Sequence, residues 1–224
     1  MLTYLFKYYD KLFLLLLEHL QIVSLSILIS LLIAVPAGLL ISRSKKVSTV
    51  VLAAFGVIYS IPSLALFALL IPFLGLGKTT AVFVLVLYNQ YILVRNILAG
   101  FQSVEPSIIE AGRGMGLSPL QLFFKIQLPL AMPVILGGVR IATVSTIGIA
   151  TIAAVINAGG LGVILFDGLR MSYLPKILWG TILASGLAFT ANQVLLLFEK
   201  RSTLKARGEA GLKKEKWKEF EVLK

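Results

Sequence analysis

Three stretches of this sequence hold residue types that could do chemistry, and the first has the composition of a phosphate-binding loop. The residues Gly75-Leu76-Gly77-Lys78-Thr79-Thr80 combine glycine, lysine and threonine, which can cradle and neutralise phosphates. Pro72, however, stands where such a loop needs its first glycine, and the segment joins two apolar runs instead of a strand and a helix. We therefore predict no nucleotide site in this chain.

The second stretch is the adjacent pair Glu18 and His19, an acid and a base at the start of a long apolar run. Acid–base catalysis also needs correctly placed partners, and no apolar run carries paired carboxylates or a Ser/His/Asp set. We interpret the pair as one that lies at a membrane interface. The chain has no cysteine and one histidine, which excludes thiolate and histidine-cluster metal sites. We predict no catalytic residues, no metal ligands and no cofactor in this chain.

The third stretch, Glu110 to Pro129, is polar and glycine-rich and lies between long apolar runs. Its glycines precede Ser118, which can cap a helix that has Pro119 at its first position. The apolar residues that follow are near helical spacing, so the pattern predicts a helix, a turn at Gly116 and a second helix. A loop of this kind is too long for a tight turn, and it offers a docking surface.

The elements that must position these stretches are membrane helices. Hydrophobic residues make up 58% of the 224 residues and charged residues 14%, whereas about a quarter of the residues in a soluble domain are charged. The mean hydropathy is +0.95. The run from Gln21 to Ser42 holds 22 uncharged residues, and as a helix it would span roughly 33 Å. We predict an all-α integral membrane protein with about five transmembrane helices.

Charged residues and prolines divide the chain into parts. We predict an interfacial segment over residues 1–19, a transmembrane domain over 20–198 and a basic cytoplasmic tail over 199–224. The expected spans are 21–42, 50–71, 79–96, 134–158 and 177–198, with a cytoplasmic loop at 103–129. The second span is expected to kink at Pro62, and Arg140 is expected to snorkel to the inner membrane interface.

The distribution of lysine and arginine predicts how the chain lies in the membrane. With five spans, 16 of the 21 basic residues fall on the side that holds the 103–129 loop and the tail, and five fall on the other. Because basic residues concentrate on the cytoplasmic side, we predict an external N-terminus, with the loop and tail in the cytoplasm. The net charge of +11 then reflects topology, and no nucleic-acid partner is needed.

The spans also limit how transport could be powered. Between His19 and Arg95 the sequence has no Asp, Glu or His. Ion-coupled carriers normally place an ionisable residue inside the membrane, because that charge couples the gradient to transport. If this chain moves a solute uphill, the energy must therefore enter from a cytoplasmic partner, and the 103–129 loop is the available contact surface.

The loop resembles a motif of a known family. Glu110-Ala111-Gly112, three residues, Gly116, nine residues and Ile126-Gln127-Leu128-Pro129 are similar to the EAA loop of ABC importer permeases, E-A-A-x3-G-x9-I-x-L-P, with Gly112 in place of an alanine. In that family the loop forms a coupling helix in a cleft of the ATPase subunit. The resemblance implies a type I ABC-importer permease fold, and small residues would allow close approach to the partner. It assigns the ATPase contact to Glu110, Ala111, Gly112, Arg113, Gly116, Leu117, Ser118 and Pro119.

Flanking stretches are similar to the osmoprotectant branch of that family, the permeases for glycine betaine, carnitine and choline. They are Ile61-Pro62-Ser63-Leu64-Ala65-Leu66, Arg95-Asn96 and Ala158-Gly159-Gly160-Leu161-Gly162, whereas Ile92 departs from the branch's usual proline. The resemblance implies a second permease chain, identical or paralogous, and two cytoplasmic ABC ATPases that hold ATP and magnesium. It also implies an extracytoplasmic substrate-binding protein.

Polar side chains within the apolar spans are the candidates for lining a translocation pathway. A competing interpretation is that they bond their own helix or a neighbouring one. The alternatives for the whole chain are a permease for amino acids such as methionine, an unpowered channel and a structural membrane subunit. The pathway candidates are Tyr59, Ser60, Tyr88, Asn89, Gln90, Thr143, Ser145, Thr146 and Asn157.

Overall fold

The computed structural model describes residues 2–209, and within them the chain is helical between its turns and contains no strand. Short π-helical and 3-10 turns, η1 (Phe123–Gln127) and η2 (Ala153–Ile156), flank α7. The α-helices are α1 (Leu2–Ile41), α2 (Lys45–Ser60), α3 (Ser63–Leu74), α4 (Lys78–Gln102), α5 (Pro106–Gly114), α6 (Pro119–Leu122), α7 (Leu128–Ile152), α8 (Gly162–Arg170) and α9 (Leu174–Ala206).

Four helical runs in the described residues are long and apolar enough to cross a membrane: Thr3–Ile41, Lys78–Gln102, Pro119–Ile156 and Leu174–Ala206. A fifth crossing is available if α2 and α3 count as one span, although they bend by 95° at their junction. This arrangement agrees with the predicted all-α membrane protein of about five spans.

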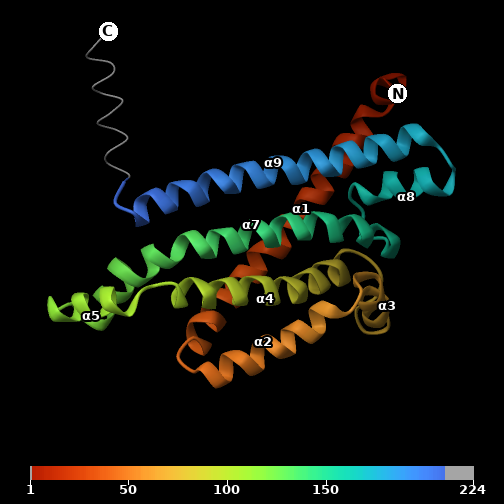
Figure 1. Ribbon diagram of the computed structural model, residues 1–224. Coiled ribbons are helices and arrows are strands. Elements are labelled where there is room, and N and C mark those ends of the chain that lie inside the picture. The colour runs from red at the N-terminus through yellow and green to blue at the C-terminus, as the bar shows by residue number, and fades with distance from the viewer. Residues whose placement is uncertain (1, 210–224) are drawn as a thin grey trace, which may run out of the picture.

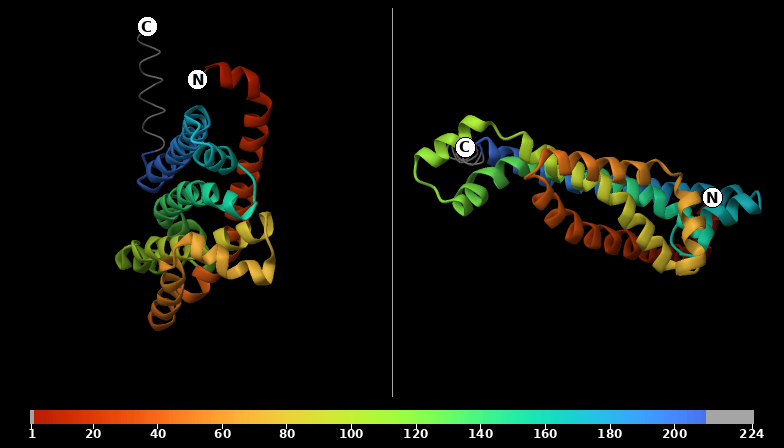
Figure 2. Two further views of the ribbon diagram at one scale, coloured as in Figure 1. Left: turned by 90° about the vertical axis from the view of Figure 1, so that its right-hand side faces the viewer. Right: turned by 90° about the horizontal axis from the view of Figure 1, so that it is seen from below.

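The long helices lie side by side (Figure 1). α7 packs between α4 and α9, α2 packs on α4, and α1 crosses behind α4 and α7. α5 lies at one end of the bundle, here called the loop end, where α9 also finishes. The opposite end, here called the α8 end, holds α3, α8 and the start of α1 (Figures 1 and 2). α1 therefore begins at the end of the bundle opposite to the one where α9 finishes.

Close approach of α4 and α7 depends on small residues, as is usual between membrane helices. A Cβ on Gly138 of α7 would lie 2.3 Å from the Cβ of Asn96. A Cβ on Gly100 of α4 would lie 2.9 Å from the backbone oxygen of Ala131. The side chains buried around this contact include Leu85, Leu93 and Ile97. α4 is consequently the most enclosed of the candidate spans in the described chain.

Three features differ from the sequence-based expectation. Residues 2–19 of the predicted interfacial segment are continuous with the first span in α1, which has one non-helical residue at Tyr8. The second span is two helices instead of one kinked helix, because the chain turns at Ile61 and Pro62, where the backbone is extended. α9 extends beyond 198 to Ala206, and residues 210–224 of the predicted tail lie outside the described part of the chain.

Candidate functional site

The predicted helix, turn and second helix are present at the loop end. α5 ends at Gly114, and Gly116 turns the chain with φ +78°, a left-handed conformation that favours glycine. Ser118 then caps α6: the Gln121 backbone N–H donates to Ser118 Oγ at 3.3 Å, and the Ser118 N–H donates to Gln121 Oε1 at 3.0 Å. This reciprocal pair is a capping box, with Pro119 at the first helical position.

Gly112, one of the residues predicted to contact the ATPase, packs inside the loop in the single chain. It is buried within the loop, and a Cβ there would lie 2.6 Å from Leu122 Cδ1 and 2.8 Å from Ile126 Cδ1. The small residue therefore allows α5 to pack on the helix that follows. It does not lie at an open surface where it could admit a partner.

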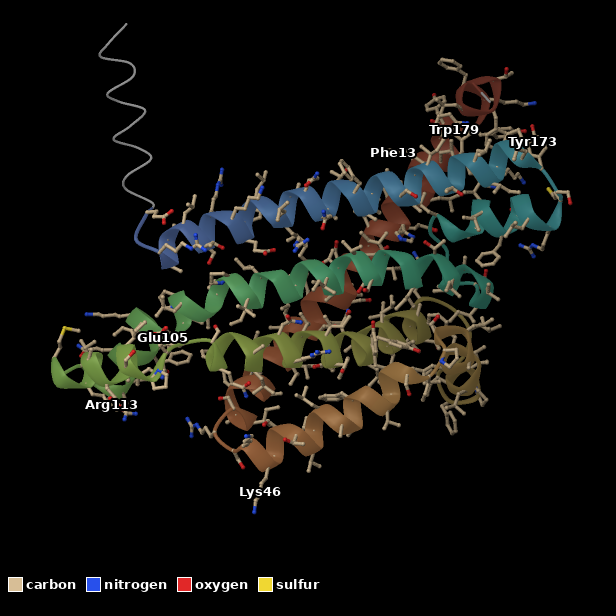
Figure 3. The ribbon with its side chains drawn as sticks, in the orientation of Figure 1. Phe13, Lys46, Glu105, Arg113, Tyr173 and Trp179 are labelled. Atoms are coloured by element: carbon tan, nitrogen blue, oxygen red, sulfur yellow. The ribbon has the colours of Figure 1, made fainter. Side chains whose placement is uncertain are left out.

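The outward surface of the loop is mixed in character. Glu110, Ala111 and Arg113 of α5 are exposed. Apolar side chains are also exposed at this end: Met115 at 73%, Leu120 at 72% and Phe124 at 61% of their surface. Figure 3 shows Arg113 at the extreme of the loop end. Large apolar side chains that are exposed beside charged ones are typical of a protein contact surface.

α6 is joined to the membrane helix α7 without a break. The π-turn η1 connects them, and the Leu128 N–H donates to the Phe123 carbonyl. Together α6, η1, α7 and η2 form a single helical run from Pro119 to Ile156. A displacement of α6 would therefore be passed directly to the membrane part of α7.

Four of the nine pathway candidates are buried within the single chain: Tyr88, Asn89, Gln90 and Thr146. Thr146 Oγ1 lies 3.0 Å from Asn89 Oδ1, so these two side chains link α4 to α7. Gln90 Nε2 donates to the Ser30 carbonyl of α1 at 3.4 Å. Tyr88 donates its hydroxyl proton to the carbonyl of Ile61, at the α2–α3 break. In this chain the four side chains link helices to one another.

The other five candidates retain some exposure. Tyr59 and Ser60 lie exposed at the end of α2, and Asn157 is exposed in the left-handed conformation after η2. Thr143 and Ser145 are half-buried on α7, and Thr143 Oγ1 donates to the Val139 carbonyl at 2.8 Å. The structure does not gather the nine residues into one cluster, since they divide between buried helix contacts and open faces.

Glu18 and His19 form a polar junction at the α8 end. The Leu161 N–H donates to His19 Nδ1 at 3.3 Å, so Nε2 carries the ring proton and donates to the Ile147 carbonyl at 3.2 Å. The Gly160 N–H donates to Glu18 Oε2 at 3.0 Å. Since Gly160 has φ +77°, its loop is bent sharply where it meets α1. The pair thus holds the turn between α7 and α8 against α1.

The stretch with the composition of a phosphate loop connects α3 and α4. Lys78 begins α4, and its Nζ lies 3.8 Å from Glu18 Oε1. Thr80 Oγ1 donates to the Gly75 carbonyl at 2.6 Å. No group of three or more His, Cys, Asp or Glu side chains in residues 2–209 could hold a metal ion.

An ion pair between α7 and α9 was not predicted. Arg140 Nε donates to Glu199 Oε2 at 2.8 Å, and Arg140 Nη1 donates to Asn192 Oδ1 at 3.1 Å. The two charged side chains are 27% and 24% exposed. The prediction that Arg140 lies at the inner membrane interface stays a prediction, and the structure adds that a carboxylate from the neighbouring helix pairs with it. The sequence signal that could have indicated this ion pair is the helical spacing of polar residues on α9.

Known transport proteins are similar to this chain in sequence and in fold. Residues 8–203 match the family described as "Binding-protein-dependent transport system inner membrane component". Among relatives, the chain is 38% identical to the carnitine transport permease protein OpuCB of Listeria monocytogenes, over 86% of this chain and 88% of the relative. It is 36% identical to the choline transport system permease protein OpuBB of Bacillus subtilis, over 83% and 86%. It is 39% identical to the osmoprotectant import permease protein OsmW of Salmonella typhimurium, over 80% and 85%.

Solved structures share the fold. An inward-facing conformation of the MetNI methionine ABC transporter matches with a TM-score of 0.75 at 22% identity, over 85% of this chain and 95% of that chain. A chain from the crystal structure of an amino acid ABC transporter with histidines matches with a TM-score of 0.74 at 22% identity, over 89% and 97%.

Proposed function

Since the chain belongs to the family of binding-protein-dependent transport system inner membrane components, we propose that it is the permease subunit of an ATP-driven importer for osmoprotectants. Its substrates would be quaternary amines of the glycine betaine, carnitine and choline type. The observation that carries the proposal is 34–39% identity to carnitine, choline and osmoprotectant permeases over most of both chains. The fold match to amino-acid importers is weaker in sequence, at 22%.

The partners follow from the family. Permeases of this kind work with an ATPase and a substrate-binding protein. We propose two permease chains side by side and two cytoplasmic ATPases, which would hold ATP and magnesium. We also propose that the loop end, which carries α5 and the end of α9, faces the cytoplasm. The excess of lysine and arginine in the segments predicted to be cytoplasmic supports this orientation.

The coupling surface is proposed to be α5, the turn at Gly116 and α6. Glu110, Ala111 and Arg113 would contact the ATPase directly, together with Leu117, Ser118 and Pro119 of the turn and α6. Gly112 would act indirectly by allowing α5 to pack. The exposure of Met115, Leu120 and Phe124 supports this assignment, because large apolar side chains left open at this end are available for a partner to cover.

ATP binding would draw the two ATPases together and displace the coupling helices. Because α6 is continuous with α7, that displacement would tilt a membrane helix and switch the pathway between its inward-open and outward-open states. We propose Tyr59, Ser60, Thr143, Ser145 and Asn157 as pathway residues. Tyr88, Asn89, Gln90 and Thr146 would support them from within the wall.

The experiment is reconstitution of the permease with its ATPase and binding protein in proteoliposomes, with labelled glycine betaine, carnitine and choline outside. Wild type would be compared with Glu110→Arg and Gly116→Trp, and with Lys46→Glu as a charge-reversal control at an exposed site outside the loop. We expect wild type and the control to bind the ATPase and transport, and both loop variants to lose ATP-dependent uptake.

The other results separate the alternatives. Uptake without ATPase would indicate a channel, and uptake of methionine without quaternary amines would favour an amino-acid permease. An ATPase that never associates, or loop variants that behave like wild type, would refute the assignment of the coupling surface.

A further inference from the structure

One face of α4 carries aromatic rings and a charge. Tyr88, Tyr91 and Arg95 are three and four residues apart, a spacing that places them on one side of a helix. Tyr59 reaches this face from α2, with its ring centroid 5.1 Å from that of Tyr91 and 5.6 Å from that of Tyr88. The four residues are here called the tyrosine–arginine face. It joins the end of α2 to α4.

Arg95 is oriented along this face. Its guanidinium lies 5.9 Å from the centre of the Tyr91 ring, and Nη1 donates to the Tyr91 hydroxyl at 3.4 Å. Tyr91 lies one turn before Arg95, so the side chain points back into the bundle, away from the loop end where α4 finishes. Snorkelling toward that end would need the opposite direction.

The charge of Arg95 is exposed, and within residues 2–209 it has no carboxylate partner. Arg95 is exposed in the single chain, and none of the ion pairs formed within residues 2–209 includes it. It lies seven residues before the end of α4 at Gln102, or roughly 10 Å along the helix. An exposed guanidinium without an ion-pair partner in the described chain is free to bind a carboxylate from a ligand or a protein neighbour.

Tyr59 adds an open aromatic surface. It is 37% exposed, so part of its ring is free although its neighbour Tyr88 is buried. Ser60 is exposed beside it. The face thus offers an aromatic surface that attracts cations and, one ring away, a guanidinium that binds carboxylates.

We propose that the tyrosine–arginine face is a transit site for zwitterionic quaternary ammonium compounds, with the carboxylate on Arg95 and the quaternary ammonium against Tyr59 and Tyr91. The inference rests on the proposed function and deepens it by distinguishing substrates. Glycine betaine and carnitine carry both groups, whereas choline lacks the carboxylate and would use the tyrosines alone.

The test uses the complete importer in proteoliposomes with saturating, substrate-loaded binding protein, so that the maximal uptake rate reports events in the membrane. Arg95→Gln removes the charge, Arg95→Lys keeps it, Tyr59→Leu removes the ring and Tyr59→Phe keeps it. Lys46→Gln is the matched loss of an exposed cation elsewhere on the chain. ATPase association is measured for every variant.

We expect Arg95→Gln to lower the maximal uptake of glycine betaine and carnitine by about tenfold while choline changes little, since a charged hydrogen bond is lost. Arg95→Lys should restore much of the difference. Tyr59→Leu should lower uptake of all three by roughly three- to fivefold, whereas Tyr59→Phe should not. Lys46→Gln should leave every rate unchanged.

If Arg95→Gln lowers uptake of choline and betaine by one common factor, or of neither, the site is refuted, because a residue that only packs α2 on α4 would affect all substrates alike. If Arg95→Gln no longer assembles with the ATPase, Arg95→Lys is tested in its place. An equal loss of uptake for all three substrates in Arg95→Lys would then refute the proposal. A wild-type complex that transports no quaternary amine refutes the proposed function itself, a result distinct from either of these.

Discussion

The ion pair between Arg140 and Glu199 should carry a large share of the contact between α7 and α9. Replacing Glu199 with leucine would leave the Arg140 guanidinium beside apolar helices with only Asn192 as a partner. Replacing Arg140 with leucine would leave the carboxylate unpaired. The double replacement removes both charges, so it should destabilise the chain less than the two single changes added together.

The expected loss of unfolding free energy follows from how exposed the two charged side chains are. Breaking a buried pair by removing one partner costs about 3–5 kcal/mol, whereas exposed pairs are worth about 0–1 kcal/mol. Arg140 and Glu199 are 27% and 24% exposed and 2.8 Å apart, which places them nearer the buried limit. We expect each single variant to lose roughly 2–3 kcal/mol of unfolding free energy, with a coupling energy of about 2 kcal/mol in a double-mutant cycle.

The assay is reversible unfolding in mixed micelles of increasing SDS content, followed by circular dichroism. The matched control is the pair Arg170–Asp167, whose closest atoms are 2.7 Å apart, a similar distance, but whose arginine is 75% exposed. Its cycle should give less than about 1 kcal/mol. A coupling energy for Arg140–Glu199 no larger than that of the control pair would refute the reasoning.

Three further changes test other contacts. Gly162→Ala should prevent stable folding, at a cost of about 3 kcal/mol or more, because the new Cβ would lie 1.9 Å from the Thr151 carbonyl oxygen. Expression and size-exclusion profiles would show the loss of folded protein, and a normally folded variant would contradict the close contact. His19→Asn keeps an acceptor and a donor, so it should lose less stability than His19→Leu, which leaves the buried Leu161 N–H unpaired at a cost of about 1–3 kcal/mol. The SDS titration ranks the two variants, and equal losses would contradict the junction. Ser118→Ala should lower the stability of α6 by about 1 kcal/mol. The change would be measured as faster hydrogen exchange at the Gln121 amide, and unchanged exchange would contradict the cap.

Local features of the loop could be predicted from sequence because each depends on neighbouring residues. Ser118, Pro119 and Gln121 determine where α6 begins through a cap that spans four residues. A glycine is favoured at position 116 because φ there is +78°, and the glycine-rich sequence predicted a turn at this residue. The spans could likewise be predicted, since uncharged length is sufficient to indicate a membrane helix.

Features that depend on tertiary contact could not be predicted. Gly112 faces Leu122, a contact that depends on the angle at which α5 returns to the helix that follows. Arg140 and Glu199 are 59 residues apart, so no local pattern joins them. Pro62 indicated a break in the second span, but the 95° bend depends on packing against α4, where Tyr88 binds the Ile61 carbonyl.

The same limit applies to the pathway candidates. A polar side chain in an apolar run has either a helix partner or an open face, and the sequence does not say which. Thr146 has Asn89 as its neighbour, whereas Tyr59 stays partly open. Tyr91 was not among the candidates, because nothing in the sequence shows that Arg95 lies over its ring.

The contacts of α7 indicate which helices would move together. α7 continues from α6, is joined to α9 by Arg140 and Glu199, and is joined to α4 by Thr146 and Asn89. We infer that a displacement of the loop is carried to α9 mainly through the ion pair. Glu199→Leu should therefore lower ATP-dependent uptake several-fold while the ATPase still binds, because the α5–α6 surface is intact. ATPase association measured beside uptake decides this, and parallel loss of both would mean that the pair supports folding alone.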